Sequence, residues 1–142
     1  MKTTDYCDYE LSKALKAAGF DESCDHCYVV DKDTESNIEF TEYASRSKWN
    51  SAKIGGSKYP YKHISAPTLA YAQKWLREKW GIAVSVQARE IQGELWYSAD
   101  IVTTKGFDEL VDGGFDYLEY EAALSAGLNA ALDLLAGKEG EG

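Results

Sequence analysis

The 142-residue chain contains few of the residues that mark specialised classes of protein: two prolines, two histidines and three cysteines. It has no apolar run near the ~20 residues that cross a bilayer, and its first residues, MKTTDYCDYE, lack the apolar core of a signal peptide. The odd number of cysteines argues against a disulfide framework. With 44% hydrophobic residues the chain can form a core. We therefore expect a cytoplasmic protein that does not bind a membrane.

Acidic residues are missing from one long stretch of an acidic chain. Residues 43–77 contain seven Lys and Arg and no Asp or Glu, whereas the rest contains eight basic and 24 acidic residues, for a net charge of -9. Residues 106–137 alone carry seven acidic residues and no basic one. Such a charge distribution predicts attraction to an acidic partner, to nucleic acid or to the protein's own acidic segments.

Three segments have the apolar spacing of amphipathic helices. The first begins near Thr4 or Asp5 and ends at Gly19, with an apolar stripe of Leu11, Ala14, Leu15 and Ala18. The second covers residues 65–81, with Ser65 as cap and Gly81 as stop; its buried line is Leu69, Ala72, Leu76 and Trp80, with Trp75 at the edge. The third covers residues 120–137, where Gly127 among inward alanines and leucines predicts close contact with a strand or helix.

Four segments are predicted to be strands, arranged as two hairpins. Residues 27–31 and 37–43 flank the polar turn KDTES, and residues 82–88 and 95–102 flank EIQGE, with Gly93 at the turn. Residues 44–64 are rich in Ser, Gly and Lys and show little periodicity. A structureless connection of about 20 residues is unusually long, so this predicted loop is either mobile or functional.

The order of helix, hairpin, helix, hairpin and helix predicts an α+β fold. Each hairpin has one apolar face and each helix one apolar stripe, so the economical arrangement is a two-layer sandwich. We expect one antiparallel sheet of about four strands with the three helices packed on one face. Residues 1–136 would form a single domain with the basic loop at 44–64, and residues 137–142 a disordered tail.

Metal binding is a weak prediction. Cys24 and Cys27 have the spacing of a zinc knuckle, and Cys7 or His63 would complete the ligands, but a second close pair is missing. A redox role requires the CxxC at a helix start, whereas here it precedes a predicted strand. Buried free thiols are the alternative. We therefore predict no cofactor and keep the three cysteines as weak metal candidates.

Other catalytic and binding motifs are incomplete. Residues 108–119 resemble a calcium loop, with acids at positions 1, 5, 9 and 12 and Gly113 at position 6, but Leu110 replaces the carboxylate of position 3. The segment AKIGGSK lacks the GxxxxGK[ST] of a nucleotide loop. No known motif links His26 or His63 to a nucleophile. We therefore predict no catalytic residue and no enzyme.

The predicted loop supplies the candidate partner-binding residues. Basic and aromatic side chains alternate along it: Arg46, Lys48, Trp49, Lys53, Lys58, Tyr59, Tyr61 and Lys62. This mixture suits phosphate contacts with base stacking, but the acidic remainder of the chain would repel a phosphate backbone. An acidic protein is therefore the first expected partner and nucleic acid the second. Docking of the loop on the chain's own acidic third, a second surface at residues 108–121 and a homodimer remain open.

Three segments resemble a known group of proteins: YELSKALKAAGFDESCDH, SAPTLAYAQKWLREKWGI with the hairpin after it, and YEAALSAGLNAALDLL. They are similar to small proteins encoded in phage and prophage regions of gut bacteria. The resemblance implies a cytoplasmic protein of a bacterial host, of mobile-element origin. The group has no established activity, so the resemblance implies no catalytic residue.

These observations predict a non-enzymatic accessory protein of phage or prophage type that binds another macromolecule, first of all a protein. The alternative is a nucleic-acid-binding protein that uses the basic aromatic loop at 44–64. A small metal-binding protein or an enzyme comes third.

Overall fold

The computed structural model describes residues 2–56, 58–104, 106–111 and 116–140, with the backbone alone for residues 106–111 and 138–140. The chain divides into two compact units. We call Tyr6–Pro67 the N-terminal unit, and Met1–Asp5 together with Thr68–Gly142 the C-terminal unit. The single domain over residues 1–136 stays a prediction.

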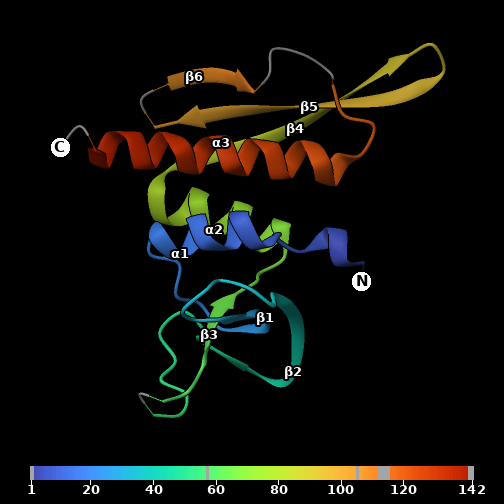
Figure 1. Cartoon of the computed structure of the whole chain (residues 1–142). Helices are drawn as coiled ribbons and strands as arrows, with labels where there is room; N and C mark the ends of the chain where they lie inside the picture. The colour runs from blue at the N-terminus through green and yellow to red at the C-terminus, as the bar shows by residue number, and fades with distance from the viewer. Residues whose placement is uncertain (1, 57, 105, 112–115, 141–142) are drawn as a thin grey trace. The chain divides into compact units, whose positions relative to one another are not determined.

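The N-terminal unit consists of a helix and a three-stranded antiparallel sheet (Figure 1). Its elements are α1 (Tyr9–Ala17), β1 (Cys24–Asp31), β2 (Glu39–Ser47) and β3 (Tyr61–Ser65), and the strand order is β2-β1-β3. Helix α1 starts later than predicted because Asp8 caps it: its carboxylate accepts a hydrogen bond from the Leu11 amide at 2.8 Å.

Helix α1 and the loop between β2 and β3 cover opposite faces of this sheet. Tyr28 and Val29 are neighbours in β1 and therefore point to opposite faces. The Tyr28 hydroxyl donates a hydrogen bond to the Cys7 carbonyl oxygen at 2.8 Å, and its ring lies 5.6 Å from that of Tyr9 in α1. Val29 pairs with His63, whose ring stacks on the loop residue Trp49. Strand β1 is thus enclosed on both faces.

The C-terminal unit contains the second antiparallel sheet, of order β4-β5-β6, and the two longer helices. Its elements are η1 (Thr3–Asp5), α2 (Leu69–Trp80), β4 (Ile82–Ile91), β5 (Glu94–Thr103), β6 (Gly106–Val111) and α3 (Tyr120–Gly140). Helix α3 lies along the sheet (Figure 1). The core is formed by side chains of β4, β5, α2 and α3, among them Ile82, Val84, Ala99, Ile101, Leu76, Leu124, Leu128 and Leu132.

Helix α2 confirms the predicted stop and corrects the predicted start. Gly81 has a φ of 66° and ends the helix in the left-handed conformation. Thr68 is the cap instead of Ser65, because Ser65 belongs to β3. The edge position was also wrong: Trp75 is buried and Trp80 is exposed.

Gly127 confirms the predicted close contact between α3 and a strand. A Cβ atom at this position would lie 2.5 Å from Val84 Cγ1 and 3.0 Å from Ala99 Cβ. The absence of a side chain therefore lets the helix axis approach both β4 and β5.

The α+β class is confirmed, but the single four-stranded sheet with three helices on one face is wrong. Each predicted hairpin gains a third strand: β3 pairs with β1, and β6 pairs with β5. With these strands in place the two hairpins belong to separate sheets.

The predicted loop at 44–64 is also shorter than expected. Its first residues belong to β2 and its last to β3, so the connection is residues 48–60, which we call the basic loop. Of the predicted tail, residues 137–140 continue α3, and residues 141–142 lie outside the described residues. Within the described part of the chain, every helix is too short or too polar to cross a bilayer.

Candidate binding surface

The basic loop is attached to its own sheet by Trp49. This side chain is only 8% exposed, and its indole nitrogen donates a hydrogen bond to the Cys24 carbonyl oxygen at 2.7 Å. Its ring lies 4.5 Å from that of Tyr43 and 5.5 Å from that of His63. Trp49 therefore acts on the candidate surface by holding the loop, not by offering an exposed ring.

Asn50 gives the loop a second attachment. Its side-chain amide donates to the Phe20 carbonyl oxygen at 2.7 Å, and its carbonyl oxygen accepts from the Ser65 backbone amide at 2.9 Å. One side chain thus joins the segment after α1 to the end of β3. Sequence reasoning missed this residue, because a lone Asn in a polar loop carries no signal of a distant partner.

His63 lies at the centre of an aromatic cluster, and sequence reasoning did not assign it this position. Its ring is stacked on Trp49 and, at 6.1 Å with an interplanar angle of 8°, on Tyr59. His63 is buried, and this desolvation lowers its pKa below the ordinary value. The neutral imidazole therefore packs as one more aromatic ring.

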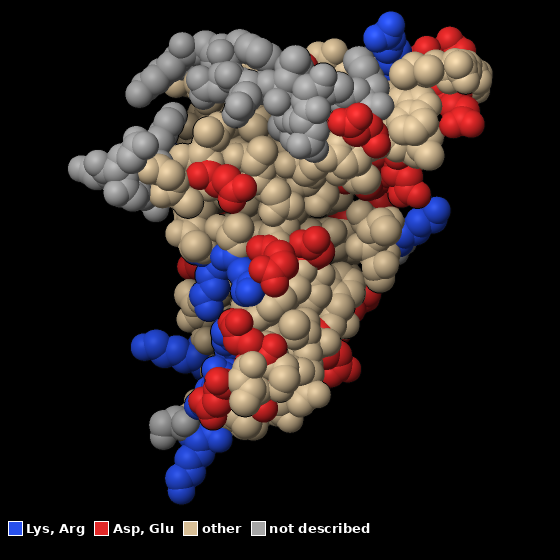
Figure 2. All heavy atoms as spheres, turned by 45° about the horizontal axis from the view of Figure 1, so that its top comes forward, with Lys and Arg blue, Asp and Glu red and all other residues tan. Residues whose placement is uncertain are grey.

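The exposed part of the loop consists mainly of lysines and small residues. The side chains of Lys48, Lys53 and Lys58 are exposed, and among the described residues none of them makes a hydrogen bond or an ion pair. Tyr61 and Ile54 are exposed at 43% and 37%. Figure 2 shows Lys and Arg side chains gathered along one side of the N-terminal unit, with acidic side chains beside them.

The other two predicted cations have partners inside the unit. Arg46 donates a hydrogen bond to the Ser23 carbonyl oxygen. Lys62 pairs with Glu35 at 2.8 Å, and this bond lowers the pKa of the Glu35 carboxyl. The Glu35 carboxylate also lies near Lys13, 3.9 Å away. The predicted set of binding residues is therefore divided into unpaired lysines on the loop and paired cations on the strands.

The three cysteines are free, buried thiols in the N-terminal unit. Cys24 and Cys27 both lie in β1, and Cys7 precedes α1. Burial raises the pKa of Cys24 to about 11, that of Cys27 to about 12, and that of Cys7 further still. Metals bind the thiolate form. Within the described part of the chain, no group of three or more His, Cys, Asp or Glu side chains is arranged to hold a metal ion.

The predicted calcium-like loop and second acidic surface can be followed only in part. Residues 106–111 form β6, residues 112–115 lie outside the described residues, and α3 begins at Tyr120. Asp108, at position 1 of the calcium-like pattern, therefore lies on a strand.

A comparison of the chain with protein-family models, with curated proteins and with solved structures finds no match.

Proposed function

We propose that this chain is a non-enzymatic binding protein whose basic loop (residues 48–60) recognises an acidic surface on another protein. The observation that carries the proposal is that the base of the loop is fixed whereas its lysines are unpaired. Trp49 and Asn50 hold it against the sheet, while Lys48, Lys53 and Lys58 have no partner among the described residues.

Such a surface is favourable for association for a physical reason. Binding costs free energy when a loop must be ordered first, and a loop already fixed at its base reduces this cost. Unpaired lysines attract and orient an acidic partner, which increases the rate of association. The exposed side chains of Tyr61 and Ile54 add apolar contact area beside the charges.

A protein partner is favoured over nucleic acid because few aromatic rings of this surface have open faces. Stacking of bases requires open ring faces. Of the three predicted aromatic residues, Trp49 is buried, Tyr59 is stacked on His63, and Tyr61 is exposed. A single exposed ring beside lysines suits a mixed protein surface better than a run of bases.

We propose further, from the resemblance of its sequence, that the protein is a phage- or prophage-type accessory protein of the bacterial cytoplasm.

Affinity purification from a bacterial host lysate, followed by calorimetry with the purified partner, tests the proposal. The test variant carries Lys48→Gln, Lys53→Gln and Lys58→Gln. The control variant carries Lys74→Gln, Arg77→Gln and Lys79→Gln on α2, so both lose the same charge. We expect an acidic protein that the control retains and the loop variant loses, with an affinity that falls as salt rises.

Equal retention of the partner by both triple variants would contradict the proposal, because the binding surface would then lie outside the basic loop. So would a partner that binds with the same affinity at low and high salt.

A further inference from the structure

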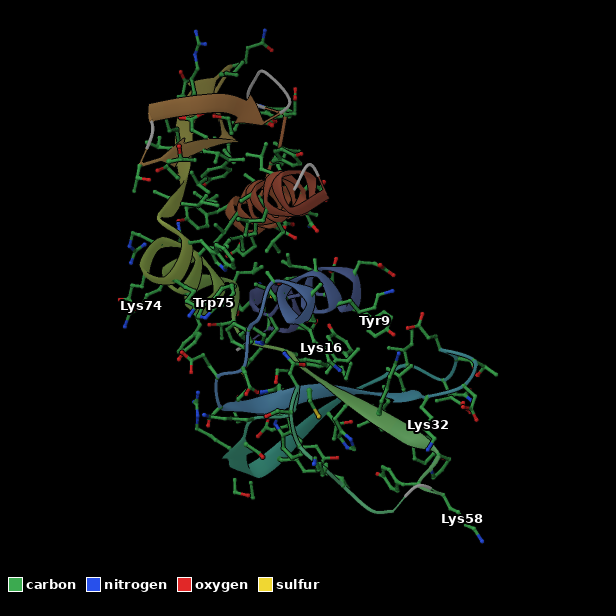
Figure 3. All side chains as sticks on the ribbon, turned by 90° about the vertical axis from the view of Figure 1, so that its left-hand side faces the viewer. Tyr9, Lys16, Lys32, Lys58, Lys74 and Trp75 are labelled. Carbon is green, nitrogen blue, oxygen red and sulfur yellow. The ribbon has the colours of Figure 1, made fainter. Side chains whose placement is uncertain are left out.

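A small pocket opens within the N-terminal unit, between the end of α1, the basic loop and β3. It has a volume of about 210 Å³, and its lining includes Lys16, Asn50, Lys53, Lys62 and His63. Figure 3 shows Lys16 between α1 and the strands, and Lys58 projecting away at the far end of the loop. The pocket therefore brings Lys16 of α1 together with Lys53 of the basic loop and Lys62 of β3. Sequence reasoning did not associate Lys16 with the loop.

The lining contains three lysines, of which Lys62 is the one that forms an ion pair with a described residue. Among the described residues that form the lining, none is Asp or Glu. The amines of Lys16 and Lys53 make no hydrogen bond or ion pair with described residues, and Lys62 is shared with Glu35 at 2.8 Å. Two full positive charges are thus available to a ligand.

Part of the pocket wall is fixed before any ligand enters. Trp49 and Asn50 are held by their hydrogen bonds to Cys24 and Phe20. The imidazole of His63, buried and stacked between Trp49 and Tyr59, closes one side. A wall that is already in place lowers the cost of binding, because less of the site must become ordered.

We propose that this pocket binds a phosphate monoester dianion, most directly that of a phosphorylated side chain on the partner protein. A phosphate monoester carries a charge of about -1.5 to -2 at neutral pH, which matches the two unpaired lysines. The volume lies below the range of about 300–1,000 Å³ that holds drug-sized ligands, so it suits one charged group of a larger molecule. This inference rests on the proposed function, since it names the chemical group that the basic surface would recognise.

The test is a titration of the ¹⁵N-labelled protein followed by amide NMR at pH 7.5. The probes are inorganic phosphate, a short peptide with a central phosphoserine, and the same peptide with serine, at equal ionic strength. We expect both phosphate probes to shift the amides of residues 50, 52–55 and 61–63, and the serine peptide to leave them unchanged. Tighter binding of the phosphopeptide than of inorganic phosphate would assign the group to a phosphorylated protein, and the reverse order to a free phosphate compound.

Matched lysine variants separate the pocket from the general charge of the loop. Lys16→Gln and Lys53→Gln should each weaken binding of the phosphate probes about ten-fold, as expected for the loss of one charge-assisted contact. Lys48→Gln and Lys58→Gln remove the same charge outside the pocket lining and should change the affinity by less than about two-fold, because exposed charges are screened. Equal effects of all four variants, or no shift at millimolar phosphate, would overturn the pocket.

Lys16→Gln also distinguishes failure of this inference from failure of the proposed function, since Lys16 lies outside the basic loop. If this variant loses the phosphate probes but binds the partner as the wild type does, the pocket plays no part in recognition and the proposed function stands. If the loop triple variant retains the partner, the proposed function itself fails.

Discussion

At the scale of single residues, substitution of Asn50 tests directly how the basic loop is held. Replacing it with Ala removes two hydrogen bonds and leaves the Ser65 backbone amide without its acceptor. We expect Asn50→Ala to lower the free energy of unfolding by about 1–3 kcal/mol, measured by urea denaturation. The control is Ser51→Ala, whose bond to Asp21 is exposed and should contribute less than about 0.5 kcal/mol. Equal stability of both variants would show that Asn50 does not hold the loop.

His63 predicts a dependence of stability on pH. Desolvation lowers its pKa in the folded protein, so the unfolded chain binds the proton more tightly. The contribution of His63 to the free energy of unfolding should therefore be fully present above the unfolded pKa of about 6.5, and it should be lost as the pH decreases below this value. Asp25 and Glu35, whose pKa values are lowered by His26 and Lys62, lose their contributions only in the region of about pH 4 and below.

The measurement is urea denaturation at pH 7.5 and 5.5 for the wild type and for His63→Phe, which keeps an aromatic ring between Trp49 and Tyr59. We expect the wild type to lose more stability between these two values than the variant. The same loss in both proteins would mean that another group is protonated on unfolding.

At the scale of secondary-structure elements, Gly127 controls how closely α3 packs on the sheet. Alanine normally stabilises a helix relative to glycine by about 1 kcal/mol, but here its Cβ would overlap Val84 Cγ1 at 2.5 Å. We expect Gly127→Ala to destabilise the protein by about 1–3 kcal/mol. Gly137→Ala in the same helix meets no atom within 4 Å, and it should be neutral or stabilising. Thermal unfolding followed by circular dichroism compares the two, and a stabilised Gly127→Ala would refute the close contact.

The turn between β4 and β5 offers a substitution that should stabilise the protein. Its two turn residues, Gln92 and Gly93, both have positive φ, at 50° and 84°, as a type I′ turn requires. Asn adopts this conformation more readily than Gln, so Gln92→Asn should raise the free energy of unfolding by a few tenths to about 1 kcal/mol. Gln92→Val should lower it by about 1–2 kcal/mol, because a β-branched residue is strained there. Chemical denaturation measures both variants. A Gln92→Asn variant that is less stable than the wild type, or a Gln92→Val variant that is more stable, would contradict the assigned turn.

The elements that sequence reasoning found are those with a strong local signal. The second helix has an apolar stripe and a terminal Gly81, and the hairpin of residues 82–103 has alternation with a glycine turn. Strand β3 was missed because it is covered on both faces, so His63, Ile64 and Ser65 are all buried and show no alternation. Residues 61–64 were therefore assigned to the Ser-, Gly- and Lys-rich loop, and Ser65 to the cap of the second helix.

At the scale of the whole molecule, the missed strands explain the wrong sheet. The single four-stranded sheet was predicted because each hairpin has one apolar face and each helix one apolar stripe, a pattern that does not show which strands are neighbours. Strands β3 and β6 occupy one edge of each hairpin instead. The candidate binding residues were found through charge, which is visible along the chain. Asn50, His63 and Lys16 were not, because their roles depend on contacts between distant segments.

The net charge of the molecule predicts that polyanions in general do not bind. Although residues 43–77 contain seven cations and no acid, the whole chain carries -9, and a long phosphate backbone extends past the local positive patch. We expect no gel-shift with mixed-sequence single-stranded DNA or RNA at low salt, under conditions where the phosphoserine peptide binds. A shift that falls log-linearly with salt and is lost in the Lys48, Lys53 and Lys58 variant would favour the nucleic-acid alternative.

The attachment of the basic loop through its first residues has a consequence for how this surface can diversify. Because Trp49 and Asn50 carry the bonds to the sheet, residues 51–56 are exposed and take no part in the core. Related chains can therefore exchange residues 51–54 and acquire new targets while the framework that displays them is conserved. Gly55 is excluded from this exchange, because its φ is 68° and a Cβ atom there would lie 2.8 Å from Tyr59 Cβ. The same property makes the unit a scaffold for library selection, with randomised positions between Asn50 and Gly55.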